Sequence, residues 1–517
     1  MRLPALRRVV AGGIFGLLLA ALLVAEFQRP LNSDSAWLLH VADRVAQGDR
    51  LYVDLIEINP PLVVWLQIPI VSLAGRLGLD PISAFRIAVL AWIGLCLVLS
   101  ARVLRSGTVR VRDRRWILLA IVMVALGWTR AHFGEREHIA LVALLPYLFA
   151  TAMAEHGRAP RPAIRMIVGL LAALGFTLKP HFLLVWIVCL LYIAWNRRTA
   201  RSLLAVENLT ILAFVIVYGL LIVVGVPEYV SMVSRLASTY DAFARKRLAS
   251  LVLESAEALC AIGALFAYGL LRRSLRTREI GDVLALATGA FLLAVVVQRK
   301  GFSYHYYPVS GSTLLLAAVA LIGREGFAGR AVEKVAVLTL SVLLLLAAAS
   351  GVSWSLIPLW REEPQYLQQR QMAEYIRGHA ADGSVLRLGY EDNFPLIDQA
   401  GVRWAMRFPN LWFVQAAYAQ QLASSPEPVY RAPPQMGVAE RWCFEAVLDD
   451  FLRTHPSLLM IIQPHPRGVA GDITRMDYLK YFSQDPRFVA AFRTYEYIGV
   501  VKGYSVFQRP GSRQEAH

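Results

Sequence analysis

Eleven long apolar stretches are the feature that most constrains how this chain can fold. Each is long enough, or nearly so, to cross about 30 Å of hydrocarbon as a helix. With 57% hydrophobic and 17% charged residues, the chain lacks the composition of a soluble surface. The sequence predicts a polytopic α-helical membrane protein and excludes a soluble enzyme, a disordered scaffold, a coiled coil and a disulfide-stapled secreted module. The stretches lie near residues 9–25, 84–104, 116–131, 139–154, 166–179, 181–195, 203–226, 249–271, 280–298, 308–323 and 335–357.

Clusters of Arg in the connections predict the topology, because connections rich in Lys and Arg lie on the cytoplasmic side. Residues 61–77 are also apolar, but counting them as a crossing would move the Arg-rich connection 102–115 to the outer side. We therefore expect 61–77 to form an interfacial or re-entrant juxtamembrane helix that starts at Pro60-Pro61. About eleven helices then cross the membrane, with the amino end in the cytoplasm. The Arg-rich connections are residues 102–115, 158–165, 197–201, 272–278 and 324–334.

The basic excess also bears on partners and source. The formal net charge is +16, yet no basic stretch is interleaved with base-stacking aromatic residues, so we expect no nucleic-acid partner. Only six of the 53 basic residues are Lys, which is typical of a GC-rich bacterial genome. We expect a multi-pass protein of the bacterial cytoplasmic (inner) membrane.

The composition changes abruptly near residue 359. Short apolar or alternating runs at 384–388 and 458–462 predict strands, and 365–379 and 440–454 predict helices between them. About 159 residues suffice for a soluble domain with its own core. We therefore expect a membrane domain over 1–358 and a soluble α/β-type periplasmic domain over 359–517.

The first outer loop, residues 26–83, is far too long for a simple connector, and such loops are usually functional. Asn32-Ser33-Asp34 precedes an amphipathic stretch that predicts a helix lying on the membrane. Asp34 is then either an N-cap or a catalytic carboxylate, and the two roles are compatible. Later in the loop, Glu57 and Asn59 are either site residues or solvated turn residues.

Three further outer segments carry ionisable residues beside aromatic residues. Such residues at a membrane boundary are costly and are functional candidates. The alternatives are a mutually neutralised charge cluster in the first of them and an interfacial aromatic belt in the last. Because the topology places all three on the face that holds Asp34, they favour a lipid-walled site for an anionic lipid headgroup. The candidates are Arg130, Arg136, Glu137 and His138, then Lys179 and His181, then Lys300, Tyr304 and His305.

In their order along residues 9–325, these motifs resemble those of the GT-C fold glycosyltransferases that use polyprenyl-phosphate sugars, the bacterial relatives of protein O-mannosyltransferases and of the lipid A aminoarabinose transferase. Asn32-Ser33-Asp34 is similar to the family's first-loop acidic motif, and residues 57–62 to its Pro-Pro-Leu juxtamembrane entry. Thr177-Leu178-Lys179-Pro180 resembles its split-helix lysine turn, and 300–308 resembles its donor-phosphate turn. Glu137-His138 departs from the Asp-Pro that many members carry.

The resemblance implies an inverting transfer of a hexosyl or pentosyl group from a polyprenyl monophosphate to a hydroxyl acceptor on the outer face. Asp34 would be the base, and Glu137 would orient the acceptor or the sugar. The acceptor, whether glycan, lipid or protein, would be handled by the soluble domain. The donor phosphate would be held by Lys179, Lys300, His305, Arg130 and Arg136, with the alternative that Arg130 or Arg136 holds Glu137. Further substrate contacts would come from Glu57, Asn59, His138, His181 and Tyr304.

This scheme requires no metal or other cofactor. The outer loops hold no spaced Asp pairs of the metal-binding kind, and Asp449-Asp450 is interpreted as a solvated helix end. Two other functions stay open: a flippase or transporter of lipid-linked sugars, and an outer-face polymerase or ligase that uses a polyprenyl diphosphate donor. The one-sided placement disfavours the carrier, which needs binding groups near the midplane.

Overall fold

The chain forms two compact units in the computed structural model, which describes residues 3–107, 109–153, 160–197, 203–325, 330–361, 363–380, 383–425, 428–464 and 476–510. We call the first the helical unit; it comprises Met1–Ser35, Pro60–Leu221 and Lys246–Glu362. We call the second the sheet unit; it comprises Ala36–Asn59, Ile222–Arg245 and Glu363–His517. The sheet unit thus includes part of the first outer loop. The predicted division into 1–358 and 359–517 stays a prediction.

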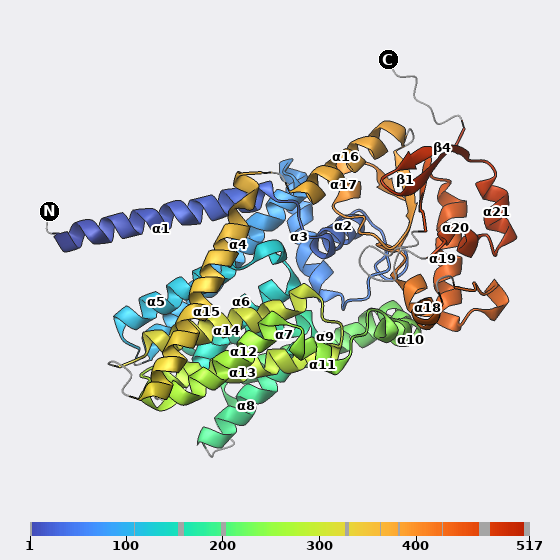
Figure 1. Cartoon of the computed structure of the whole chain (residues 1–517). Coiled ribbons are helices and arrows are strands. Elements are labelled where there is room, and N and C mark those ends of the chain that lie inside the picture. The colour runs from blue at the N-terminus through green and yellow to red at the C-terminus, as the bar shows by residue number, and fades with distance from the viewer. Residues whose placement is uncertain are drawn as a thin grey trace. The chain divides into compact units, whose positions relative to one another are not determined.

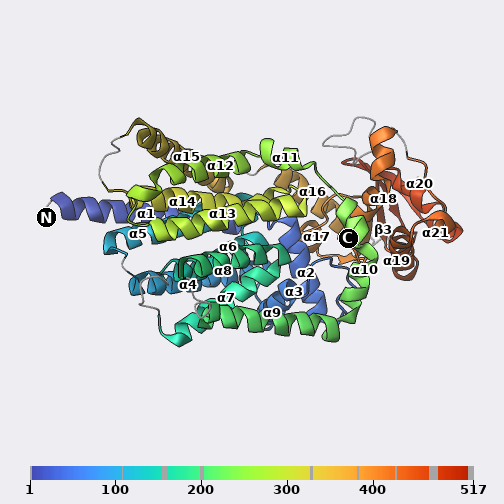
Figure 2. The same cartoon turned by 90° about the horizontal axis from the view of Figure 1, so that it is seen from below.

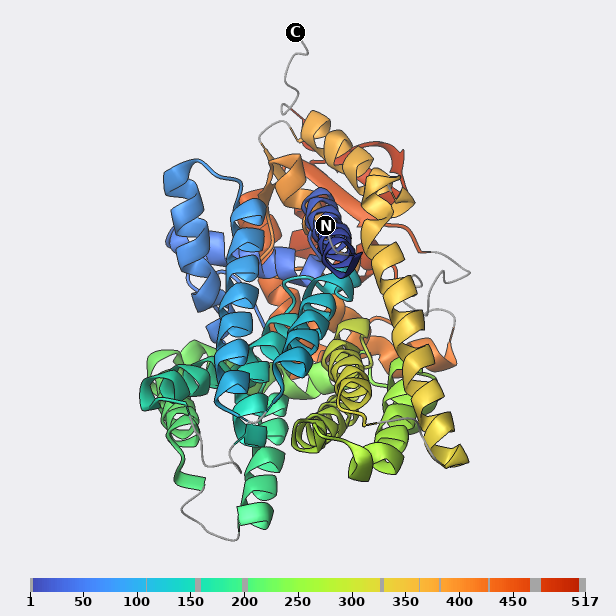
Figure 3. The same cartoon turned by 90° about the vertical axis from the view of Figure 1, so that its left-hand side faces the viewer.

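The helical unit consists of long apolar helices that pack along one another, and Figures 1 and 2 both show α13 beside α14. Figure 3 views α1 end-on from its amino end. The described residues of the apolar stretches expected to cross the membrane are mostly helical. The helices are α1 (Leu3–Gln28), α3 (Leu62–Leu77), α4 (Pro81–Ser106), α5 (Val111–Val122), α6 (Arg136–Met153), α7 (Pro162–Leu178), α8 (Leu183–Arg197), most of α9 (Val206–Gly225), α11 (Leu248–Leu253), α12 (Ala256–Leu271), α13 (Arg278–Gln298), α14 (Tyr307–Ile322) and α15 (Ala331–Leu356).

Within the described residues, five helices are long and apolar enough to cross a membrane, and a bent pair formed by α1 and α2 (Ser33–Ala46) makes a sixth candidate. The chain is therefore a multi-pass membrane protein. Helices such as α7 are apolar but shorter, so the expected number of about eleven crossings stays a prediction. The helix α3 has 16 residues, or about 24 Å at 1.5 Å per residue, which is short of the hydrocarbon thickness.

Two apolar stretches differ from the expected continuous helix. The stretch 249–271 is broken at Glu254-Ser255 into α11 and α12, because the Ser255 side chain accepts a hydrogen bond from the Ala258 backbone N–H (3.2 Å) and starts a new helix. The stretch 116–131 is α helix only to Val122 and continues as a π-helical turn, η1 (Met123–Gly127). Such turns are often found at functional sites.

The sheet unit confirms the secondary structure expected for the carboxyl-terminal part. The predicted strands are β1 (Ser384–Leu388) and β3 (Leu458–Ile462), and the two predicted helices are α16 (Pro364–His379) and α19 (Val438–Thr454). The five strands lie in the order β2-β1-β3-β5-β4, parallel among β2, β1 and β3 and antiparallel at β5 and β4. The remaining elements are β2 (Arg403–Trp404), β4 (Glu496–Val501), β5 (Tyr504–Gln508), α10 (Pro227–Ala242), α17 (Leu396–Ala400), α18 (Trp412–Ser424), α20 (Tyr478–Phe482) and α21 (Pro486–Phe492).

Residues 36–59, which lie in the predicted first outer loop, contribute to the sheet unit through specific contacts. On α2, His40 Nδ1 lies 2.9 Å from Asp398 Oδ1, and the His40 ring packs on Phe394. The Ile56 backbone N–H donates to the Arg407 carbonyl oxygen (2.8 Å). These contacts lie within the sheet unit and join residues 36–59 to the carboxyl-terminal part of the chain.

Asp450 is buried, so its interpretation as a solvated helix end is wrong. Its carboxylate accepts hydrogen bonds from the Arg407 backbone N–H (2.8 Å) and guanidinium (2.8 and 3.0 Å), and from Arg453 (3.0 Å). We expect Asp450→Asn to lower the melting temperature of the sheet unit by roughly 6–12 °C, because it leaves a partly buried Arg unpaired. The exposed neighbour provides the control: Asp449→Asn should leave the melting temperature unchanged, and an equal shift in both variants would contradict this role.

Candidate functional site

The amino end of α6 places three ionisable residues in succession, Glu135, Arg136 and Glu137, and all three are buried. The preceding turn needs Gly134, whose φ is +77° and where a Cβ would lie 2.5 Å from the Phe85 ring. His138 fastens the turn, since its Nδ1 accepts from the Gly134 N–H (3.1 Å) and its Nε2 lies 3.0 Å from the Ala125 carbonyl oxygen. The three side chains are therefore held by a rigid turn.

Glu137 meets a cation from another helix end. Lys179 lies in the break between α7 and the short η4 (Pro180–Phe182), and its Nζ donates to Glu137 Oε1. His305, in η7 (Ser303–Tyr306) before α14, has its Nε2 4.0 Å from the same oxygen. The Glu137 and His305 side chains are 1% and 2% exposed. Three helix breaks thus converge on one carboxylate.

Asp34 joins this cluster through Arg136. Its Oδ2 lies 3.2 Å from Arg136 Nη2, and its own side chain is 41% exposed while that of Arg136 is 5% exposed. The cap of α2 is Asn32, whose Oδ1 accepts from the Asp34 backbone N–H (2.9 Å). The Asp34 carboxylate is therefore free of the N-cap role considered for it and faces the cation of α6.

Aromatic and basic residues surround the Lys179 ammonium. It lies 4.9 Å from the centre of the Tyr304 ring, within cation–π range. Tyr304 in turn packs edge-on against His305 at 4.6 Å. The charges of Lys179, Arg136, His181 and Lys300 all act on His305, and Lys300 is itself buried. The predicted phosphate-binding residues other than Arg130 therefore gather at one place in the helical unit.

The structure does not bring every predicted residue into this cluster. Arg130 packs over the Trp128 ring (4.3 Å) and donates to Ser350, so its side chain is engaged elsewhere. Glu57 accepts from the Trp37 indole (2.7 Å) and from Asn59, within the sheet unit. Both His138 nitrogens are bonded to the backbone. These contacts favour structural roles for Arg130, Glu57, Asn59 and His138, against the donor- and substrate-binding roles expected.

Glu135 is a buried residue of this cluster that the sequence analysis did not single out. It is fully buried, and neither carboxylate oxygen has a hydrogen-bond partner. Burial raises the pKa of Glu135 well above its usual range, and the negative charges of Asp34 and Glu137 raise it further. The run Glu135-Arg136-Glu137-His138 carries a signal for it in the sequence, namely an acid on each side of one Arg.

Unpartnered buried atoms are concentrated in this cluster. They are Arg136 Nε and Nη1, Glu137 Oε2, both oxygens of Glu135, and the Nδ1 atoms of His305 and His181. Buried polar atoms nearly always have partners, so such a group indicates a place for water or a polar ligand. Within the described residues, no three His, Cys, Asp or Glu side chains are grouped to hold a metal ion. The unpartnered atoms of this cluster thus place hydrogen-bond donors for an anion beside acceptors for hydroxyl groups.

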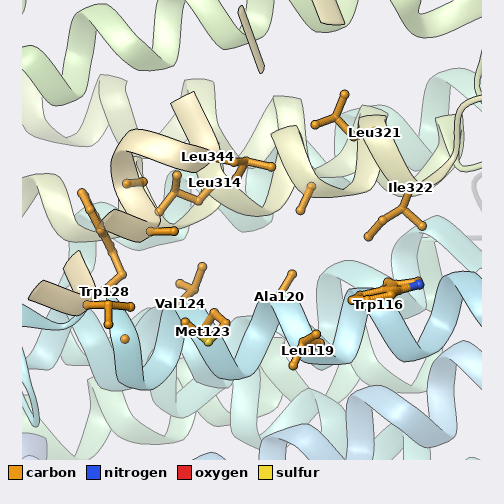
Figure 4. Close-up of a pocket in the computed structure, with 15 residues that line it drawn as sticks. Trp116, Leu119, Ala120, Met123, Val124, Trp128, Leu314, Leu321, Ile322 and Leu344 are labelled. Carbon is orange, nitrogen blue, oxygen red and sulfur yellow. The ribbon is translucent and has the colours of Figure 1, made fainter. Parts of the chain in front are cut away.

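An apolar cavity runs along α5 and η1. Its volume is about 310 Å³, and α5 with η1, α14 and α15 form its walls (Figure 4). Trp128 stands at one end, where its indole donates to Ser310 (2.9 Å), and Trp116 stands at the other. The lining is almost entirely hydrocarbon, as in a site for an apolar chain.

Comparison of the sequence with family models and with curated proteins gives no match. The structure, however, superposes on the crystal structure of ArnT from Cupriavidus metallidurans in the apo state with a TM-score of 0.57, at 15% identity, over 96% of this chain and 98% of that one. The chain has the GT-C fold. This confirms the fold that the sequence motifs implied, and at this identity the likeness concerns the fold alone.

Two other solved structures with the GT-C fold give weaker superpositions. The arabinofuranosyltransferase AftD from Mycobacteria matches at 14% identity over 96% of this chain and 39% of that one, with a TM-score of 0.43. The oligosaccharyltransferase AglB from Archaeoglobus fulgidus, in complex with an inhibitory peptide and a dolichol-phosphate, matches at 11% identity over 96% and 74%, with a TM-score of 0.45.

Proposed function

We propose that this protein is an inverting glycosyltransferase that moves a sugar from a polyprenyl monophosphate to a hydroxyl acceptor on the outer face of a bacterial inner membrane. The observation that carries the proposal is the cluster in which Asp34, Arg136, Glu137 and Lys179 meet at helix ends. It combines a partly exposed carboxylate with buried cations, which is what a base and a phosphate clamp require. The GT-C fold and the apolar cavity agree with a lipid-linked donor.

The reaction divides between these groups as follows. Asp34 accepts the proton of the acceptor hydroxyl as its oxygen bonds to the anomeric carbon. The bond from that carbon to the phosphate oxygen breaks, and its electron pair leaves with the phosphate. Attack from the opposite side inverts the anomeric centre. Lys179 and Arg136, with Lys300 and His305 nearby, stabilise the charge that develops on the phosphate.

Both cations of the cluster are paired with carboxylates, which sets a condition on donor binding. Lys179 is bound to Glu137 and Arg136 to Asp34. A phosphate that recruits Arg136 would release Asp34 to act on the acceptor. Donor binding would thus both complete the clamp and free the base, which favours an ordered reaction with the donor first.

The test uses full-length protein reconstituted in vesicles. Undecaprenyl-phosphate monosaccharides are supplied as donors in one arm and an undecaprenyl-diphosphate-linked glycan in another, with a mixed membrane and glycan extract as acceptor. We expect sugar transfer with release of undecaprenyl phosphate from the monophosphate donor only. Transfer from the diphosphate alone would instead identify a polymerase or ligase. Movement of donor across the vesicle membrane without any cleavage would identify a flippase.

A further inference from the structure

Glu135 is unusual among the buried carboxylates that the structure describes. The others each have an ion pair or a hydrogen bond: Glu137 binds Lys179, Glu207 binds Arg165 (2.7 Å), and Asp450 binds Arg407. Glu135 has neither, although none of its surface is exposed. It precedes the first residue of α6, but its side chain makes no capping hydrogen bond. A structural role would use at least one of its oxygens.

The groups that face Glu135 come from three places in the helical unit. Asp34 approaches from α2, Arg136 and Glu137 from α6, and Lys179 from the break after α7. Each cation is already paired with another of these acids, Arg136 with Asp34 and Lys179 with Glu137. A third negative charge would therefore lie beside two carboxylates with no cation of its own. The neutral carboxyl form avoids this repulsion, and burial also favours it.

A neutral carboxyl group has one O–H donor and an acceptor oxygen. A sugar hydroxyl offers the same pair in reverse, so the two groups can form two hydrogen bonds without any net charge. A phosphate oxygen would instead bind more strongly to the cations. The chemistry of Glu135 thus differs from that of the phosphate clamp beside it.

We propose that Glu135 is a sugar-binding residue, which holds a hydroxyl of the transferred sugar as a neutral carboxyl while Lys179 and Arg136 hold the phosphate. This inference rests on the proposed function and deepens it. It assigns recognition of the sugar to Glu135, and recognition of the phosphate to Arg136 beside it at the start of α6 and to Lys179 in the break after α7. Glu135 therefore contributes to the choice of sugar. Its substitution should change the affinity for a lipid phosphate that carries a sugar, and leave unchanged the affinity for a lipid phosphate without one.

The experiment compares two probes, undecaprenyl phosphate and an undecaprenyl-phosphate monosaccharide that the wild type transfers. Reconstituted wild type, Glu135→Ala and Glu135→Gln are compared, with the exposed Glu374→Ala as control. We expect Glu135→Ala to weaken binding of the sugar-bearing probe about 10-fold, the effect of losing neutral hydrogen bonds, while binding of undecaprenyl phosphate stays unchanged. Glu135→Gln, which is also neutral and can donate and accept, should restore most of the affinity.

The outcomes separate the possible failures. If every variant bound each probe as tightly as the wild type does, buried water alone would satisfy Glu135. That result would overturn this inference and leave the proposed function intact. An equal loss for both probes would assign Glu135 to the clamp or to folding and would also overturn it. A wild type that transfers no sugar from any undecaprenyl-phosphate monosaccharide and does not bind undecaprenyl phosphate would overturn both proposals.

The pH dependence gives a readout that a structural role would not change. Because the pKa of Glu135 is raised, the group is neutral at low pH and ionises as the pH rises through that raised value. Affinity of the wild type for the sugar-bearing probe should then fall with rising pH, since the O–H donor is lost and a charge appears beside Asp34 and Glu137. Glu135→Gln should remove this fall. Identical pH profiles for the two proteins would contradict the inference.

Discussion

Asp34→Asn is expected to slow sugar transfer by about 10²- to 10⁴-fold, the usual effect of removing a well-placed general base. Asn has nearly the same shape and leaves Asn32 in place as the cap of α2, so the fold should be unchanged. Donor affinity should not fall, because Asn competes less strongly than Asp with the donor phosphate for Arg136. Turnover is measured in vesicles with radiolabelled donor, and donor binding is measured separately.

The matched control lies on the same helix. Asp43 is a carboxylate on α2 that accepts a hydrogen bond from Gln47 (2.7 Å) and does not belong to the cluster. Asp43→Asn should transfer sugar at the wild-type rate. If Asp34→Asn turned over like the wild type, the assignment of the base would be wrong.

Removal of the Lys179 ammonium is expected to weaken binding of undecaprenyl phosphate by roughly 30- to 1000-fold, the range for a lost charged partner in a buried site. The single variant Lys179→Gln would also strand the buried charge of Glu137 and lower stability. The double variant Glu137→Gln/Lys179→Gln removes both charges, so it should keep the melting temperature near that of the wild type and still lack the cation. Its affinity is the informative measurement.

Lys334 provides the control for the clamp. It is exposed near the amino end of α15 and outside the cluster. Lys334→Gln should bind undecaprenyl phosphate as the wild type does. Unchanged affinity in the double variant, with the protein folded, would show that the phosphate is held elsewhere.

Much of the fold could be predicted because hydropathy and short apolar runs report directly on burial. The strand at 458–462 is a run of apolar residues with turn signals near it, and it forms β3 over those residues. The break at Glu254-Ser255 was missed because the flanking apolar residues dominate the average over the stretch. The participation of residues 36–59 and 222–245 in the sheet unit depends on long-range contacts such as His40 with Asp398, for which the local sequence gives no signal.

The residue types of the candidate site and their positions in the chain could be predicted, but which side chains pair with one another could not. Charged residues at the ends of apolar stretches identified Asp34, Glu137 and Lys179, which the structure brings together. Arg130 and Glu57 satisfied the same criterion, yet one packs on Trp128 and the other binds Trp37. The distinction depends on where a turn directs a side chain, and Glu135 was not singled out for the same reason.

The most direct test of the central claim is a structure of the reconstituted protein with undecaprenyl phosphate bound. We predict density for the phosphate within about 2.7–3.2 Å of Lys179 Nζ and of an Arg136 nitrogen, with the Asp34 carboxylate released from Arg136 and open to solvent. Phosphate bound away from these residues, with the Asp34–Arg136 and Glu137–Lys179 pairs both intact, would contradict the account.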